Sequence, residues 1–407
     1  MLKSRRAVLM LGLSSAVLGS LACGAPPREA AADRLLLQTS RGVIIVEPGA
    51  SQPAFRAPFA LPSQDWSTIV RSAFTGHSTT LRAVDPESGR QKWGRILGRN
   101  LNLKVVSGDG RTAALSPARE RYYLYGRPST TLLITGEDFP TPQKIELDGN
   151  YEPEAFSTDG QSLFVLQYRP ARLPTRYQVR RLDLRSEKVM GVYTPDADLQ
   201  ESMRGTARVQ ATSPEGTRLY TLYTVGRGDD RRAFIHVLNL EELWAHCIDL
   251  PTGFADEAES ATALTSSPDG RRLYVANAAA EAVAEIDTQR LTTVRTGELN
   301  FAPGSQTHAL HGERDTLFFA RGDRVTMVDA VTLTQKRLWL VDEKVRGLQL
   351  GRAGQLYVAL KESIVMIDLK TGDRLRTFDP PGIKRIAQFG RTPRALDDDL
   401  SKISCAC

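Results

Sequence analysis

Ser267-Pro268-Asp269-Gly270-Arg271-Arg272-Leu273-Tyr274-Val275-Ala276-Asn277 has the composition of a tight turn that leads into a β-strand. Pro268 restricts φ at the second turn position, Asp269 can accept hydrogen bonds from nearby backbone amides, and Gly270 tolerates a positive φ. An apolar, β-rich run then starts at Leu273, as expected of a strand. A second strand, which ends in an acid, is predicted at residues 282–287.

Variants of this unit recur along the chain. The leucines that open the predicted strands are 39 to 56 residues apart, at Leu163, Leu219, Leu273, Leu317 and Leu356. Such a period is long enough for four short strands, and a single four-stranded sheet cannot bury both of its faces alone. The sequence therefore predicts an all-β fold, a β-propeller of four-stranded blades.

The stretch Leu273–Asn277, which follows Ser-Pro-Asp-Gly and precedes Ile286-Asp287, resembles the YVTN-type β-propeller repeat. The resemblance extends over residues 34–390, and the unit at 263–300 is nearest to the pattern. It implies a propeller of seven or eight blades. It implies no single activity, because such proteins include binding modules and a few enzymes.

Eight hairpins can be counted, which predicts eight blades, with seven as the alternative. Seven of the hairpins are preceded by a candidate inner strand, and the first hairpin, at residues 35–46, has none of its own. Residues 385–389 can supply it. A C-terminal strand that completes the N-terminal blade would close the ring and remove exposed strand edges. The propeller domain is accordingly predicted at residues 34–390.

Residues 1–22 are predicted to form an export signal peptide. Lys3, Arg5 and Arg6 make a basic start, and the apolar or small run at 7–22 is short for a membrane-spanning helix. Ser4–Leu9 resembles the twin-arginine motif of bacterial export, with Arg5 and Arg6 as its export residues. An ordinary secretion signal with two arginines is the alternative.

Ser20-Leu21-Ala22-Cys23 resembles a bacterial lipobox, which implies lipid attachment at Cys23. Residues 23–33 then form a lipid-anchored tether. The expected location is extracytoplasmic, on the bacterial membrane through the lipid at Cys23. A soluble secreted or periplasmic protein is the alternative.

The net charge argues against nucleic acid as a partner. The full chain carries +6, and three of the positive charges lie within residues 1–22, so the mature chain carries +3. This is nearly neutral for its size, and an exported protein rarely meets nucleic acid. The protein is expected to be a monomer.

Ala83, Asp85, Gly89 and Trp93 are spaced as in the Ala-x-Asp-x-x-x-Gly-x-x-x-Trp docking motif of quinoprotein propellers. The resemblance implies that Asp85, Gly89 and Trp93 serve blade docking, with the flat indole packed between blades. The motif also occurs in propellers without a quinone, so no cofactor is predicted.

The histidines and strand-end acids favour structural roles. His308 and His311 are three residues apart on a predicted strand, so they point to opposite faces and make a poor metal pair. Acids end five predicted strands and are expected to cap turns through backbone amides: Asp85, Asp183, Asp287, Asp329 and Asp368. No metal site is predicted.

The cysteines leave their pairing open. Cys247 lies in an apolar outer strand and is interpreted as a small buried hydrophobe. Cys405 and Cys407 lie in a tail, residues 391–407, that is predicted to be disordered and redox-labile. A disulfide between them, a pairing with Cys247 and metal binding are the alternatives.

No catalytic constellation is found: there is no Gly-x-Ser-x-Gly elbow, phosphate-binding loop or paired-cysteine metal spacing. The leading hypothesis is a membrane-tethered scaffold without catalysis that binds an envelope protein or small ligand. The alternative is a propeller enzyme, lactonase-like or quinoprotein-like, with a site at the mouth of the channel.

Overall fold

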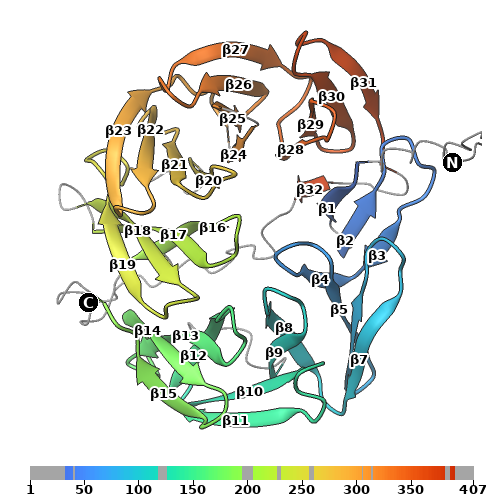
Figure 1. Cartoon of the computed structure of the whole chain (residues 1–407), viewed down its shortest axis with the longest axis vertical. Coiled ribbons are helices and arrows are strands. Elements are labelled where there is room, and N and C mark those ends of the chain that lie inside the picture. The colour runs from blue at the N-terminus through green and yellow to red at the C-terminus, as the bar shows by residue number, and fades with distance from the viewer. Residues whose placement is uncertain are drawn as a thin grey trace, which may run out of the picture. The chain divides into compact units, whose positions relative to one another are not determined.

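The protein is an eight-bladed β-propeller, seen here in a computed structural model (Figure 1). The structure describes residues 33–39, 42–117, 126–194, 205–226, 231–255, 261–304, 306–312, 315–380 and 386–389. Within these ranges there are strands and turns but no helix, and the strands form eight four-stranded antiparallel sheets. The all-β prediction is confirmed, and eight blades is the correct count rather than seven.

Each blade is a simple meander, numbered I to VIII around the ring and written here from its inner strand outward. Blade I consists of β32 (Ile386–Phe389), β1 (Leu35–Thr39), β2 (Gly42–Val46) and β3 (Phe55–Ala57). Blade II consists of β4 (Phe59–Pro62), β5 (Ile69–Thr75), β6 (Ser78–Val84) and β7 (Gln91–Leu97). Blade III consists of β8 (Leu101–Val106), β9 (Thr112–Pro117), β10 (Ser129–Gly136) and β11 (Gln143–Asp148). Blade IV consists of β12 (Asn150–Phe156), β13 (Ser162–Arg169), β14 (Arg176–Asp183) and β15 (Lys188–Gly191).

The second half of the ring has the same construction. Blade V consists of β16 (Thr206–Thr212), β17 (Arg218–Val225), β18 (Arg232–Asn239) and β19 (Ala245–Asp249). Blade VI consists of β20 (Thr262–Ser266), β21 (Arg272–Asn277), β22 (Ala282–Asp287) and β23 (Thr292–Glu298). Blade VII consists of β24 (Thr307–His311), β25 (Thr316–Arg321), β26 (Arg324–Asp329) and β27 (Gln335–Leu340). Blade VIII consists of β28 (Gly347–Leu350), β29 (Gln355–Ala359), β30 (Ile364–Asp368) and β31 (Arg374–Phe378).

The middle strands are apolar on both faces because every blade is packed between two others. On β21, Leu273 and Val275 pack toward blade V, whereas Tyr274 and Ala276 pack toward blade VII. Successive side chains of a strand point to opposite faces, so burial of both faces requires a continuous apolar run rather than an alternating one. The core is therefore distributed as clusters at the junctions between blades.

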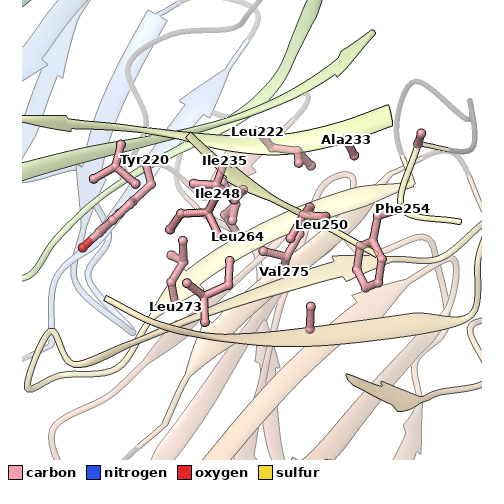
Figure 2. Close-up of a cluster of buried hydrophobic side chains, with 14 residues drawn as sticks. Tyr220, Leu222, Ala233, Ile235, Ile248, Leu250, Phe254, Leu264, Leu273 and Val275 are labelled. Carbon is pink, nitrogen blue, oxygen red and sulfur yellow. The ribbon is translucent and has the colours of Figure 1, made fainter. Parts of the chain in front are cut away.

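Figure 2 shows one of these clusters, at the junction of blades V and VI. Tyr220 and Ile235 of blade V meet Leu273 and Val275 of blade VI, and Tyr220, Ile235, Leu273 and Val275 are all fully buried. Comparable clusters lie at each of the other junctions. Since no blade buries its faces alone, each depends on its two neighbours for stability.

The turn between β20 and β21 has the predicted geometry. Ser267 Oγ donates to Asp269 Oδ1 at 2.5 Å, and that oxygen also accepts from Arg271 N at 3.1 Å. Gly270 has a φ of 70°, in the region that favours glycine. The same pattern recurs at Ser157 and Asp159 of blade IV, which explains why this turn is so visible in the sequence.

The ring is closed by its two ends, as predicted. β32 pairs with β1 in antiparallel register, with Leu37 opposite Phe389 and Gln38 opposite Gln388, and Figure 1 shows the two strands side by side. The N-terminal entry to β1 is also fixed to blade VIII, because Asp33 Oδ2 accepts from the Tyr357 hydroxyl at 2.8 Å. Strand pairing and this side-chain contact therefore hold blade I to blade VIII.

One side chain also links blades that are not neighbours. Gln64, in the turn after β4 of blade II, donates from Nε2 to Ser213 O in the corresponding turn of blade V, at 3.0 Å. Its backbone nitrogen donates to Gly108 O of blade III at 2.8 Å. The turns that follow the inner strands of blades II and V are thus linked by a direct hydrogen bond.

Candidate functional site

The inner strands differ in polarity around the ring, although their turns are equivalent. In blades II to VIII, a backbone hydrogen bond from the first turn residue marks the end of the inner strand, for example from Ser107, Ser157 and Ser213. The residue three positions before this turn residue is Lys104 in blade III, Glu154 in blade IV and Gln210 in blade V. The same position holds apolar residues in other blades: Ala60, Leu264, Ala309 and Leu348. At this position, charged or amide side chains are thus found in blades III to V.

Blades III and IV share an ionic network next to this position. Lys104 Nζ lies 2.6 Å from Glu152 Oε1, and Arg127 Nη2 lies 3.0 Å from Glu152 Oε2. The three side chains are only 10 to 15 % exposed. Arg127 Nε also donates to Asn150 Oδ1 at 2.8 Å. A mostly buried carboxylate held by two cations is well compensated, so these groups are fixed in position.

Glu154 extends the polar groups into blade V, where it accepts a hydrogen bond from Gln210 Nε2. Lys104 and Glu154 each occupy a β-bulge, where the register shifts between Leu103 and Val105 and between Pro153 and Ala155. A bulge leaves one residue without its ladder partner and reorients its side chain. We name Lys104, Arg127, Glu152, Glu154 and Gln210 the inner polar arc.

A second polar group lies at blades VII and VIII, and in the described part of the chain its members are paired neither with each other nor with an acid. His308 of β24 is 8 % exposed, and its Nε2 is buried without a hydrogen-bond partner among the described residues. Arg346, which precedes β28, has a buried Nε that likewise lacks a partner in the described part of the chain. Burial lowers the pKa of His308 to about 4, a backbone hydrogen bond with Val345 raises it, and the nearby Arg346 charge lowers it further.

His308 and His311 do face different neighbours. His308 contacts the Val345 backbone of blade VIII, whereas the His311 ring lies 5.6 Å from the Tyr274 ring of blade VI. The strand alternation expected from the sequence is therefore observed. Among the residues that the structure describes, no group of three or more histidines, cysteines and acids is placed to hold a metal ion.

Trp93 lies between blades II and III. The indole is 6 % exposed, it packs with Leu101 and Leu115 of blade III, and its Nε1 donates to Gly110 O at 2.9 Å. Asp85 Oδ1 accepts from Glu87 N at 2.8 Å and from Ser88 N at 3.1 Å. Gly89 follows with a φ of 68° and donates to Asp85 O at 2.8 Å. Asp85 and Gly89 thus shape the turn that leads to the Trp93 strand.

The other strand-end acids also cap turns, as predicted. In each case Oδ1 accepts from backbone amides two or three residues ahead: Asp183 from Ser186, Asp287 from Gln289 and Arg290, Asp329 from Val331 and Thr332, Asp368 from Lys370 and Thr371. These bonds, with the Lys336 ammonium as the largest cause, lower the pKa of Asp329 to about 2. The acids are spread over separate blades and do not converge on one site.

Glu285 of β22 is a buried acid that is paired with two arginines. Its carboxylate is 5 % exposed, with Arg272 Nε 2.8 Å from Oε1 and Arg295 Nε 2.6 Å from Oε2. Burial and this carboxylate raise the pKa of Tyr274 to about 12. Arg295 Nη2 also donates to Ala330 O of blade VII at 3.1 Å, so the network joins blades VI and VII.

Cys247 lies on β19 and is half-buried, more exposed than the buried hydrophobe expected from the sequence. It packs against Tyr168, Tyr177 and Tyr223 at the junction of blades IV and V. The neighbouring strand places His236 opposite Cys247. His236 is 5 % exposed, and burial lowers its pKa to about 4, with a smaller contribution from His246.

The predicted export and lipid residues, Arg5, Arg6 and Cys23, lie outside the described residues, as do Cys405, Cys407 and the tail at 391–407. In the described part of the chain there is no helix of the length and hydropathy needed to cross a membrane.

Sequence reasoning did not single out the inner polar arc or the His308–Arg346 pair. The available signal was a charged residue inside an otherwise apolar strand pattern, as in Leu103-Lys104-Val105-Val106. Such a charge gains a partner only through a neighbouring blade, which a single sequence does not reveal.

Comparison with solved structures supports the fold. The chain is similar to apo AztD from Citrobacter koseri, with 11 % identity, a TM-score of 0.56, and coverage of 87 % of this chain and 95 % of that one. It is also similar to the dihydro-heme d1 dehydrogenase NirN in complex with DHE, with 15 % identity, a TM-score of 0.50, and coverage of 89 % and 77 %. Saccharomyces cerevisiae Sqt1 matches with 6 % identity, a TM-score of 0.51, and coverage of 80 % and 86 %.

No protein-family model matches the sequence, and no curated protein sequence matches it. Identities this low support a shared propeller fold and no shared activity.

Proposed function

We propose that this protein is an exported propeller, held on the outer face of a bacterial membrane by lipid on Cys23, that binds a charged ligand at its inner polar arc. The ligand is a small molecule or a segment of an envelope protein, and the propeller binds it without chemical change. The YVTN-like repeat at 263–300 agrees with this reading, since proteins that carry it include binding modules.

One observation carries the binding proposal: the polarity of the inner wall is uneven. Packing of blades needs only apolar residues at the equivalent position, as Leu264 and Leu348 illustrate. Blades III to V instead carry Lys104, Glu154 and Gln210, on the strands that lie next to the centre of the ring (Figure 1). The charged side chains of the arc are already held in place by their partners. Ligand binding therefore costs little further side-chain entropy.

The proposed location rests on the sequence of residues 1–23. The test is metabolic labelling with radioactive palmitate in a producing bacterium, followed by fractionation. The wild-type chain should be labelled and found with membranes, and Cys23→Ser should be unlabelled and soluble. Replacement of both Arg5 and Arg6 by lysine should keep the chain in the cytoplasm. An unlabelled, soluble wild-type chain would contradict the lipid anchor.

The binding role is tested by native mass spectrometry of the protein purified from the envelope of its producing cells. The wild-type chain should retain a stoichiometric noncovalent ligand, and the double variant Lys104→Met/Glu152→Gln should lose it. The matched control is Lys144→Met/Glu146→Gln, which removes an exposed ion pair from β11 of blade III. A wild-type chain without a ligand, equal retention in all three proteins, or conversion of the ligand during incubation would count against the proposal.

A further inference from the structure

Blade II places two arginines directly opposite each other. Arg71 of β5 and Arg82 of β6 are partners in the antiparallel register, so their side chains share one face of the sheet. Side chains opposite each other in this way have Cβ atoms about 4.5 to 5.5 Å apart. Like charges in such a pair repel each other, so the arrangement is unfavourable unless an anion compensates it.

The face that carries both arginines is turned toward blade I. Ile69 and Val84, each two residues along the strand from one of the arginines, pack with Val43 of blade I. Alternate residues of a strand share a face, so Arg71 and Arg82 point the same way as these two. Arg71 is half-buried and Arg82 is exposed. The pair therefore reaches from the junction of the two blades to the surface.

The packing of blades does not require a charge at Arg71. The equivalent position is found by counting eight residues from the first turn residue of each blade. It is apolar and fully buried in blades III, IV and VI, and it is a buried threonine in blade V: Leu115, Val165, Val275 and Thr221. Arginine is rarely placed at such a position unless a partner compensates its charge.

Neither arginine forms a hydrogen bond or an ion pair in the part of the chain that the structure describes. Blade VI offers the contrast, because there Arg272 and Arg295 share the carboxylate of Glu285. In blade II no described acid takes that place between the two arginines. Four N–H groups at the ends of each guanidinium are thus available to an external acceptor.

The neighbours of the pair within the sheet leave room beside it. The register places Ala60 of β4 next to Arg71, and Gly94 of β7 next to Arg82. The side-chain amide of Gln91 lies against Gly94, since a Cβ at Gly94 would be 2.8 Å from Gln91 Nε2. Gln91 is exposed and supplies a neutral donor on the same side of the pair.

The charge of the pair selects the ligand class. Both guanidinium groups are permanently protonated, so the pair carries two positive charges. A phosphate group carries about −1.5 to −2 at pH 7 and offers several acceptor oxygens. Guanidinium binds phosphate through two parallel N–H···O bonds. A monoanionic carboxylate would leave one of the two positive charges uncompensated.

We propose that Arg71 and Arg82 bind a phosphate group at the junction of blades I and II, apart from the inner polar arc. The two guanidinium groups share the phosphate oxygens, and the Gln91 amide is a further donor. The phosphate is free in solution or belongs to a lipid headgroup. The site goes beyond the proposed function, because it depends neither on the arc nor on the export and lipid residues.

The probe is sodium phosphate, titrated by calorimetry into the full chain carrying Cys23→Ser at pH 7, with sodium chloride added to keep the ionic strength constant. Binding should saturate at one phosphate per chain. Sulfate should compete, because its shape and charge are similar, and acetate should not. Arg71→Gln and Arg82→Gln should each weaken binding at least about tenfold, which corresponds to about 1.4 kcal/mol. The matched control is Arg56→Gln, which removes an exposed arginine from β3 of blade I and should leave binding unchanged.

Thermal unfolding separates a binding role from a structural one. Arg71→Leu installs the residue type that blade III has at the equivalent position. In buffer without phosphate this variant should melt at or above the wild type, because the repulsion with Arg82 is removed. Phosphate should raise the midpoint of the wild type in a saturable manner and leave that of Arg71→Leu unchanged. Equal stabilisation of both proteins by phosphate would overturn the proposal.

Two further arms separate the sources of the phosphate. Cosedimentation with vesicles of phosphatidylcholine and phosphatidic acid, lost in Arg71→Gln/Arg82→Gln and kept in Arg56→Gln, assigns the site to lipid headgroups. Binding of inorganic phosphate without cosedimentation assigns it to free phosphate. No saturable binding of phosphate, or equal affinity in the wild type and the double variant, would overturn the proposal. Loss of ligand from the inner polar arc would not affect this result.

Discussion

At the scale of single residues, two buried histidines should make the stability depend on pH. His236 and His308 both have a pKa near 4 in the folded protein because burial disfavours the charged ring. In the unfolded chain they bind protons near pH 6.5. Stability that is present above pH 6.5 is therefore lost as the pH falls from 6.5 toward 4, by at most about 3 kcal/mol per histidine.

The prediction is checked with His236→Leu, by urea unfolding at intervals between pH 7 and pH 4. The variant should lose a large part of the pH dependence but not all of it, because His308 and His311, whose pKa values are also lowered by burial, retain their shares. His77→Gln, which changes an exposed histidine in the turn after β5, serves as the control and should keep the wild-type slope. Asp287 and Asp329 act in a lower range, since their turn hydrogen bonds lower their pKa values below 3.8. An unchanged slope in His236→Leu would show that His236 is already protonated in the folded state or exposed.

The same scale shows which residues can be predicted from sequence. The turn acids were predictable because Asp287 bonds to Gln289 and Arg290, only two and three residues ahead. The His308–Arg346 pair was not, because it joins separate blades across 38 positions of sequence. Interactions with near neighbours leave a local pattern, whereas interactions between blades leave none in a single sequence.

At the scale of elements, the Trp93 indole should be essential to the junction of blades II and III. It fills a buried space against Leu101 and Leu115 and donates to Gly110 O. Trp93→Ala should destabilise the protein by about 3 to 5 kcal/mol through the cavity and the lost contacts. Trp93→Phe should cost less, because most of the apolar area stays while the Gly110 carbonyl loses its donor.

Chemical denaturation monitored by circular dichroism measures both variants. Ile96→Ala is the matched control, since Ile96 lies on the same strand, β7, and is 78 % exposed. Its effect should remain within about 0.5 kcal/mol. If Trp93→Ala were no more destabilising than Ile96→Ala, the indole would not support the contact between blades.

The positions of the strands were easier to predict from the sequence than the positions of the β-bulges within them. The positions of β20, β21 and β22 follow from an apolar run bounded by a Ser-Pro-Asp-Gly turn and a terminal acid. The bulges at Lys104 and Glu154 do not follow from it, because one extra residue shifts the alternation over only one or two positions. These bulges carry Lys104 and Glu154 of the inner polar arc, so two of the residues proposed to bind a ligand lie where the sequence has no periodic signal.

At the scale of the whole molecule, the closing strand was predictable by counting. Seven inner strands for eight hairpins left one strand position unfilled, and only a C-terminal segment was left to fill it. The bridge from Gln64 to Ser213 had no such signal, because it depends on where the ring brings two distant turns together. Closure therefore follows from the requirement that strands be paired, whereas contacts across the ring depend on its dimensions.

Closure yields the last prediction, deletion of residues 380–407. β32 is then absent, and β1 has an unpaired inner edge along Leu37, Gln38 and Thr39. An exposed apolar strand edge templates pairing with other chains. The truncated chain should aggregate or melt well below the wild type, as followed by light scattering after gel filtration and by thermal unfolding.

Deletion of 390–407 alone keeps β32 and should behave as wild type. A synthetic peptide of residues 380–389 should restore the monomer by pairing with β1. If instead the 380–407 deletion stayed monomeric with an unchanged melting temperature, the shared blade would not be what holds the ring closed, and the Asp33–Tyr357 contact with its surrounding core would have to suffice.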